Sequence, residues 1–176
     1  MNITAHLHQF ESIANDWMMA LDTYDERKFN RAPDQESWSI GQVYYHLVHG
    51  TQNFHLRMVR QCMDNPDHAH EKKTFPGKIV FFTGRFPPIR IKVPPSDMYT
   101  PKQPESIAAM RRDLNTLIGT MRTVASELSQ KRNQGKAQHP RFGYLSGDEW
   151  FAMIQMHFRH HLYQKNRLDN FLKKGA

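Results

Sequence analysis

Two histidines, His157 and His161, lie four residues apart in a segment with helical periodicity. At about 100° per residue they share one helix face with the apolar residues Trp150, Ile154 and Leu168. Because burying an unpartnered imidazole costs about 1 to 3 kcal/mol, each ring needs a hydrogen bond or a shared ligand. The chain has eleven histidines, so their position on the apolar stripe is stronger evidence than their spacing. A divalent metal site is favoured, and two hydrogen-bonded core histidines are the alternative.

Metal sites in proteins generally take three or four protein ligands, so a third donor should come from a facing helix. The second predicted helix offers His46, His49 and His55. Relative to the apolar line through Leu47, His49 points away from the core, whereas His46 and His55 flank the buried stripe. The residue pattern therefore disfavours His49 and leaves His46 and His55 as alternatives.

Three neutral imidazoles would leave the charge of a divalent cation uncancelled and at least one coordination position open. Such a site suits lowering the pKa of water towards about 7 for hydrolysis, or holding a deprotonated thiol for attack on an electrophile. The sequence has no Ser-His-Asp order, phosphate-binding glycine loop or zinc-protease glutamate beside the histidine pair. We therefore assign no catalytic residue. The nearby polar residues Tyr44, Tyr45, Arg159 and Tyr163 are interpreted as bundle-edge positions.

Four segments with three- and four-residue apolar periodicity predict helices. They cover residues 4–24, 39–63, 104–128 and 146–172. Ser39 and Ser146 each begin a capping-box pattern, and Pro104 suits a first helical turn. No segment alternates polar and apolar residues over enough length to demand a sheet. We predict one all-α domain spanning residues 1–176, an antiparallel four-helix bundle.

A proline-rich connection between the second and third helices, residues 64–103, is far longer than most helix-to-helix loops. A short helix over residues 78–83 is one local prediction. A strand pair, residues 79–82 with 89–93, is the competing one. We expect this loop to cover an edge of the bundle rather than to act as a substrate lid.

The formal charge of +7 raises the question of a nucleic-acid partner. The basic residues are spread along the chain and carry no nucleic-acid motif, so we expect a solvated basic face and no such partner. The single cysteine, Cys62, cannot form an intrachain disulfide and is interpreted as a small core residue. No apolar run approaches the length of a membrane span and no leader pattern is present, so we expect a cytoplasmic protein with no membrane partner.

The fourth predicted helix has apolar residues beyond its buried stripe. They are Phe151, Phe158, Leu162 and Phe171. Bundles of this kind often pair through exposed apolar helix faces, so we expect a homodimer.

Several of these residues resemble, in order and separation, the DinB/YfiT-like superfamily of proposed metal-dependent enzymes. The matching residues are Trp38-Ser39-Ile40-Gly41-Gln42-Val43, His46-Leu47 and His157-x-x-x-His161-x-x-Gln164. A further segment is similar to one branch of that superfamily: His139-Pro140-x-Phe142-Gly143-x-Leu145-Ser146-x-x-Glu149-Trp150. The resemblance covers both histidine-bearing segments and the helix layout.

The resemblance implies that His46, His157 and His161 are the three metal ligands, with zinc or nickel as the ion. It selects His46 over His55 and places Gln164 as a support beside the site. His160, about 80° off the apolar line of its helix, is interpreted as a flanking or surface residue rather than a fourth ligand. It also implies a small-molecule substrate and a low-molecular-weight thiol, because some members act as thiol S-transferases. Leu162-Tyr163 replace the Arg-Gly often found before the glutamine, so substrate choice is not carried over. A non-catalytic helical metal-binding or stress-response module is the alternative function.

Overall fold

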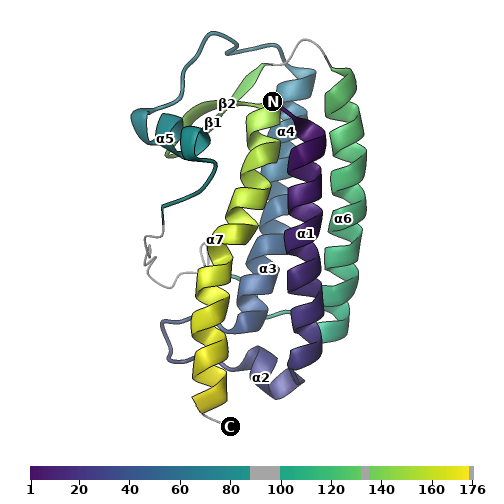
Figure 1. Cartoon of the computed structure of the whole chain (residues 1–176), viewed down its shortest axis with the longest axis vertical. Helices are drawn as coiled ribbons and strands as arrows, with labels where there is room; N and C mark the ends of the chain where they lie inside the picture. The colour runs from purple at the N-terminus through teal and green to yellow at the C-terminus, as the bar shows by residue number, and fades with distance from the viewer. Residues whose placement is uncertain (88–99, 132–134, 175–176) are drawn as a thin grey trace.

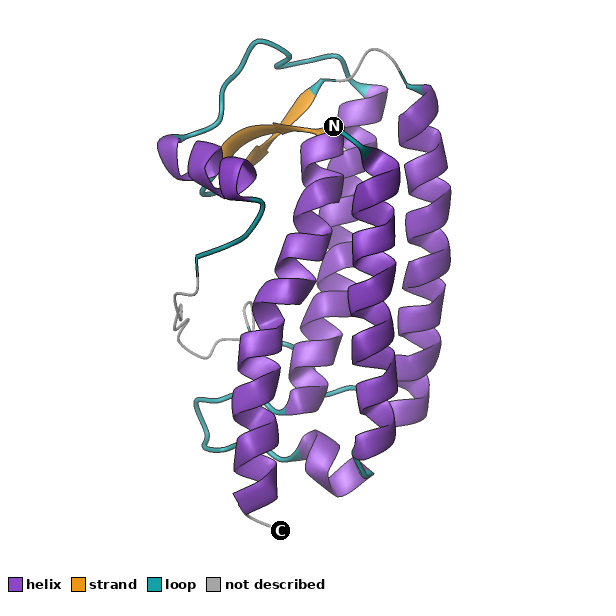
Figure 2. Cartoon of the chain, in the orientation of Figure 1, coloured by secondary structure: helices purple, strands orange, loops and turns teal. Residues whose placement is uncertain are grey.

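The computed structural model describes residues 1–87, 100–131 and 135–174 (Figure 1). Its elements in chain order are α1 (Ile3–Ala20), η1 (Leu21–Thr23), α2 (Glu26–Asn30), α3 (Ile40–Gly50), η2 (Thr51–His55), α4 (Leu56–Asp64), α5 (Phe75–Thr83), α6 (Ile107–Gln130), β1 (Lys136–His139), β2 (Gly143–Ser146) and α7 (Gly147–Lys174). Helices dominate these residues (Figure 2), which confirms the all-α prediction.

The long helices run side by side with the core between them (Figure 1). Helix α1 packs against both α6 and α7, and α3 also contacts both α6 and α7. These four helices therefore surround the hydrophobic core. The largest fully buried side chains include Trp17, Tyr44, Phe158 and Trp150. Burial of such apolar stripes supplies most of the stability of packed helices. Within the described ranges, no helix combines the length and apolar character that crossing a bilayer requires.

Caps set where the helices begin. Ser39 forms the predicted capping box, with its hydroxyl accepting from the Gln42 amide and its own amide donating to the Gln42 side chain. Ser146 and Glu149 form the second predicted box. The expected start at Pro104 is wrong, because Ser106 caps α6 through the Ala109 amide. The Ser106 hydroxyl, two residues after Pro104, accepts a hydrogen bond from an amide of the first helical turn that has no partner within the helix. A proline side chain cannot accept such a bond.

The second predicted helix, residues 39–63, is observed as α3, η2 and α4 in succession. The sequence indicated one regular helix, but Thr51–His55 form a π turn. Such a turn adds a residue and rotates the side chains that follow it relative to those before it. His55, at the end of the turn, is consequently buried, with 9% of its surface exposed.

A β-hairpin precedes α7, although the sequence predicted no strand. Strands β1 and β2 pair antiparallel, with Ala137 opposite Leu145. Gly143 has a φ of 76°, a left-handed conformation that glycine adopts without strain. Four-residue strands are too short to show an alternating pattern, which explains why the hairpin was not predicted.

The long connection contains helix α5, so the helix prediction is confirmed and the strand at residues 79–82 is wrong. The helix begins three residues before the predicted residue 78 because Thr74 caps it. Gly77 lets α5 approach the hairpin closely, since a Cβ there would lie 2.4 Å from the Phe142 carbonyl oxygen. The predicted partner strand, residues 89–93, lies outside the described residues. Helix α5 and the hairpin lie together beside the N-terminal end of α7 (Figure 1).

The apolar residues expected to form an exposed dimer face on α7 do not form one. Phe151 and Phe158 are core residues, each 1% exposed. Leu162 and Phe171 are partly buried against the same core, and the Arg31 guanidinium lies 4.9 Å above the Phe171 ring. The homodimer stays a prediction without this surface to support it.

Candidate metal centre

Helices α3 and α7 bring three histidine side chains together. His157 Nε2 lies 3.1 Å from His46 Nε2 and 3.1 Å from His161 Nε2. One nitrogen from each of the three side chains lies within 4.8 Å of the other two. The i, i+4 pair is therefore on one face of α7, as predicted, and the donor on the facing helix is His46.

The spacing of these nitrogens suits a small divalent cation. Imidazole nitrogens about 2.1 Å from a tetrahedral ion lie about 3.4 Å apart, close to the observed 3.1 Å. An all-nitrogen donor set favours zinc, nickel, copper or iron over magnesium and calcium, which prefer oxygen. Among the described residues, this is the one group of three or more potential ligands that could hold a metal, and it includes no carboxylate. The residues present therefore fit a three-nitrogen site, which leaves one position of a tetrahedral ion without a ligand from this group.

Gln164 fixes the orientation of one ring. Its Oε1 lies 2.9 Å from His161 Nδ1. Because an amide oxygen only accepts, His161 carries its proton on Nδ1 and leaves the Nε2 lone pair free. This is the support beside the site that the sequence predicted for Gln164.

Burial keeps the three rings neutral. It lowers the pKa of His46 to about 4 and the pKa of His161 to about 3. Burial, followed by the neighbouring histidines, also holds the pKa of His157 well below its ordinary value. Neutral imidazole is the form that coordinates a metal, so at pH 7 the cluster binds without first releasing protons. Each of the three residues keeps a small part of its surface exposed.

The other histidines near the site are placed differently. His49 does not belong to the group of three, as the helical geometry predicted, and its Nε2 lies 3.2 Å from the Asp113 carboxylate on α6. His55 contacts the ring of His157 at 5.2 Å between centroids but does not belong to the group of three. The structure therefore separates His46 from His55, which the residue pattern alone left open. His160, predicted as a flanking residue, also lies outside the group and faces the Phe86 ring at 5.8 Å.

Two aromatic side chains from loops flank the cluster, and the sequence analysis assigned a role to neither. The Trp38 ring lies 5.2 Å from the His46 ring, and the Phe86 ring lies 6.3 Å from the His157 ring. Trp38 directly precedes the Ser39 cap, so the start of α3 positions it. Phe86 follows α5 closely, and no periodic pattern in the sequence marks its approach to α7. Both rings are partly buried and give the surroundings of the cluster an apolar character.

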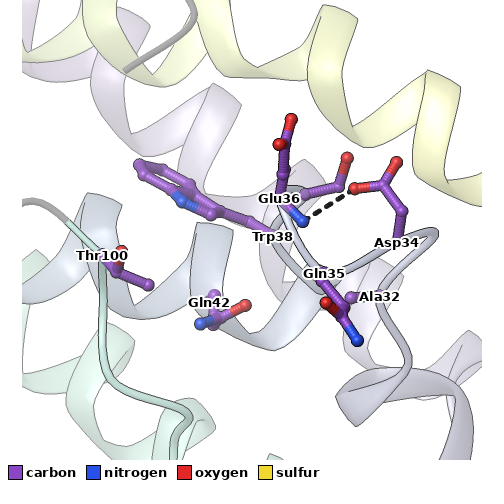
Figure 3. Close-up of a pocket in the computed structure, with 8 residues that line it drawn as sticks. Ala32, Asp34, Gln35, Glu36, Trp38, Gln42 and Thr100 are labelled. Carbon is purple, nitrogen blue, oxygen red and sulfur yellow. Dashed lines mark hydrogen bonds between the residues drawn. The ribbon is translucent and has the colours of Figure 1, made fainter. Parts of the chain in front are cut away.

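A shallow cavity of about 220 Å³ lies beside the start of α3, and Figure 3 shows its lining. None of the three clustered histidines lines it. Trp38 forms part of the lining and its ring also lies 5.2 Å from the His46 ring. The remaining lining residues are Ala32, Asp34, Gln35, Glu36, Ser37, Gln42 and Thr100.

The polar residues considered near the site have structural or exposed positions. The Tyr44 hydroxyl donates to the Trp17 carbonyl oxygen in the core, and the Tyr45 ring packs against His49 at 4.1 Å. Tyr163 and Arg159 are exposed. The exposed positions of Tyr163 and Arg159 agree with their interpretation as bundle-edge residues, whereas Tyr44 is a core residue and its edge interpretation is wrong.

Cys62 is buried, and its thiol donates to the Leu145 carbonyl oxygen at 3.5 Å. Burial raises the pKa of this thiol to about 11. It is therefore protonated at neutral pH and is not a nucleophile, which agrees with its prediction as a core residue.

A family model described as the DinB superfamily matches residues 9–164. The match includes α3, the π turn, the hairpin and the part of α7 that carries His157 and His161, and it ends at Gln164. No curated protein matches the chain.

Proposed function

Because this chain belongs to the DinB superfamily, we propose that it is a metal-dependent enzyme in which His46, His157 and His161 hold a divalent cation, zinc or nickel. The observation that carries this proposal is the convergence of three Nε2 atoms, with His157 3.1 Å from each of the others. When bound, such a cation would lower the pKa of a thiol or water ligand and so supply a nucleophile at neutral pH.

Transfer of a small thiol to an electrophilic small molecule is the reaction that the surroundings support best. A metal-bound thiolate attacks without a base to remove a proton at that step. Trp38 and Phe86 add apolar surface beside the cluster, which suits a carbon-rich ligand more than water. Hydrolysis is the second form of the proposal.

The protein's own residues would prepare the site in two ways. Gln164 holds the His161 ring so that its Nε2 faces the other two nitrogens. Burial keeps the three imidazoles neutral, so their lone pairs are free to coordinate, and because none of them is anionic they leave the charge of the cation uncancelled. The charge is then available to stabilise an anionic sulfur or oxygen ligand.

Cobalt(II)-substituted protein offers a direct test, because a thiolate bound to cobalt gives a sulfur-to-metal charge-transfer absorption. We expect 2-mercaptoethanol to produce this absorption in the wild type and not in His46→Ala. His49→Ala is the matched control, since His49 is on the same helix and faces Asp113. We also expect the zinc- or nickel-loaded protein to conjugate the thiol to 1-chloro-2,4-dinitrobenzene faster than the metal-stripped protein.

A non-catalytic metal-binding module predicts other results. The ion would then be fully coordinated by protein, would not bind the added thiol, and its removal would mainly lower the melting temperature. Cobalt binding without the charge-transfer absorption, in the absence of any hydrolytic activity, would reject the enzyme proposal while keeping the metal site.

A further inference from the structure

His55 is a buried histidine outside the three-nitrogen cluster. Only 9% of its surface is exposed, and its Nδ1 has no hydrogen-bond partner among the described residues. Its ring contacts those of Phe54, Trp150 and His157. A buried polar atom left unpaired is costly, and an apolar ring of similar size would avoid that cost. Packing alone therefore does not account for a histidine at this position.

The π turn is what directs His55 towards the cluster. An uninterrupted α-helix would place His55, nine residues after His46, on about the opposite side of the helix. The turn at Thr51–His55 changes this register, and the His55 ring lies 5.2 Å from the His157 ring. Single π turns within α-helices are often found at functional sites.

His157 lies between His55 and the other two clustered histidines. Its Nε2 faces His46 and His161, and its Nδ1, across the ring, is buried without a partner among the described residues. The rings of His46 and His161 lie 5.0 Å apart, and the recorded ring contacts of His55 include neither of them. His55 therefore contacts the His157 ring apart from the other two clustered rings, and we infer that it approaches the Nδ1 side.

A metal-binding histidine almost always donates the proton on its other nitrogen to an acceptor, which fixes the ring. His161 has this acceptor in Gln164, 2.9 Å away. His157, with Nε2 directed at the cluster, would carry its proton on Nδ1 and needs an acceptor equivalent to Gln164. His55, whose ring lies 5.2 Å from the His157 ring and whose buried Nδ1 has no partner among the described residues, can supply such an acceptor.

We propose that His55 is a positioning residue for His157, and that its Nδ1 accepts the hydrogen bond of the His157 Nδ1–H through one bridging water molecule. The two rings make no direct hydrogen bond, so a water molecule between them is needed to connect the two nitrogens. Thr51, in the same π turn, has a buried hydroxyl without a partner among the described residues and offers a third contact for that water. The inference depends on the proposed metal site.

The first test is cobalt(II) affinity, measured by competition with a chelator in the wild type, His55→Phe, His55→Gln and His49→Phe. Losing the support of one ligand typically weakens metal binding about 10- to 100-fold, and we expect this loss in His55→Phe. His55→Gln restores an acceptor and should recover part of the affinity. His49→Phe makes the same ring exchange on the same helical rod but away from the cluster, so it should bind like the wild type.

The second test separates positioning from packing, using urea unfolding of the metal-stripped proteins. His55→Phe exchanges the water-bridged imidazole for an apolar ring of similar size that fills the same space, so its unfolding midpoint should stay close to that of the wild type. A variant that gains or keeps stability while losing metal affinity is the signature of a positioning residue.

The outcomes distinguish this inference from the function on which it depends. Wild-type protein that does not bind cobalt would overturn both. Wild-type binding with unchanged affinity in His55→Phe would overturn only the role of His55. A metal-stripped His55→Phe variant that is unfolded or markedly less stable would assign His55 to core packing. A fourth nitrogen in the X-ray absorption spectrum of the cobalt protein that disappears in His55→Phe would make His55 a ligand instead.

Discussion

His46 and His157 are 111 positions apart in the sequence, and their Nε2 atoms lie 3.1 Å apart in the fold. Only the packing of α3 against α7 joins them, since neither helix carries both residues. The site is therefore sensitive to features that hold these two helices together and that fix the rings on them.

The hydrogen bond between His161 and Gln164 is one of these features. We expect Gln164→Leu to weaken zinc or cobalt binding about 10- to 100-fold, because His161 loses the acceptor that fixes its tautomer and ring orientation. Competition with a chelator measures the change. Asn166→Leu, at a nearby exposed position on α7, is the control and should bind like the wild type. Equal affinity in both variants would contradict a supporting role for Gln164.

The cap at the start of α3 is expected to contribute measurably to stability. The Ser39 hydroxyl accepts from the Gln42 amide and donates to the Gln103 side chain. Ser39→Ala should lower the free energy of unfolding by about 1 to 2 kcal/mol. Ser106→Ala removes a single cap bond on α6 and should cost about 1 kcal/mol. Urea denaturation compares the two, and a Ser39→Ala loss no larger than that of Ser106→Ala would count against the second bond.

Phe158 is expected to act in the core and not at a dimer interface. Its side chain is 1% exposed and packs edge-to-face on Phe10 at 5.2 Å. Phe158→Ala should cost about 3 to 5 kcal/mol of stability, as for other buried aromatic truncations. Phe171→Ala, at a partly buried position, should cost less. Gel filtration should give the same oligomeric state for a folded Phe158→Ala variant, whereas dissociation of a dimer at little cost in stability would contradict the assignment.

Acid should destabilise the metal-free protein. Burial lowers the pKa of His46 to about 4 and of His55 and His161 to about 3, from 6.5 in the unfolded chain. Below pH 6.5 the unfolded state binds more protons than the folded state, so the stability contributed by these neutral rings is lost as the pH falls towards 3 or 4. Each ring should contribute a loss of about 1 to 2 kcal/mol between pH 7.5 and 5.

Urea midpoints of chelator-treated protein at pH 7.5 and 5 measure this effect. His55→Phe removes one of the titrating groups and should show a smaller difference between the two pH values. Identical midpoints for the wild type at both values would show that the rings are not held neutral by the fold.

The long helices and two of the three clustered histidines followed directly from the sequence. Apolar residues repeated over many turns identify α1, α6 and α7, and the i, i+4 spacing places His157 and His161 on one face. The facing donor did not follow in the same way. His46 and His55 both flank the apolar line of a regular helix, and only the resemblance to a family distinguished them.

The features that were not predicted are local departures from regular geometry. The π turn at Thr51–His55 leaves no mark in the hydrophobic pattern, because Thr51 and Phe54 suit an ordinary α-helix equally well. The short helix α2 and the hairpin are below the length at which periodicity is informative. The contact of Phe86 with the cluster depends on how a loop crosses α7, which no spacing rule describes.

The central claim is that His46, His157 and His161 hold one divalent cation with a position open to an added ligand. Anomalous diffraction at the zinc and nickel edges, from crystals of untagged protein grown with metal, tests it most directly. We predict one strong peak about 2.1 Å from the Nε2 atoms of all three histidines, with a water or thiol as a further ligand. A peak elsewhere, or three rings without a peak in the presence of excess metal, would contradict the claim.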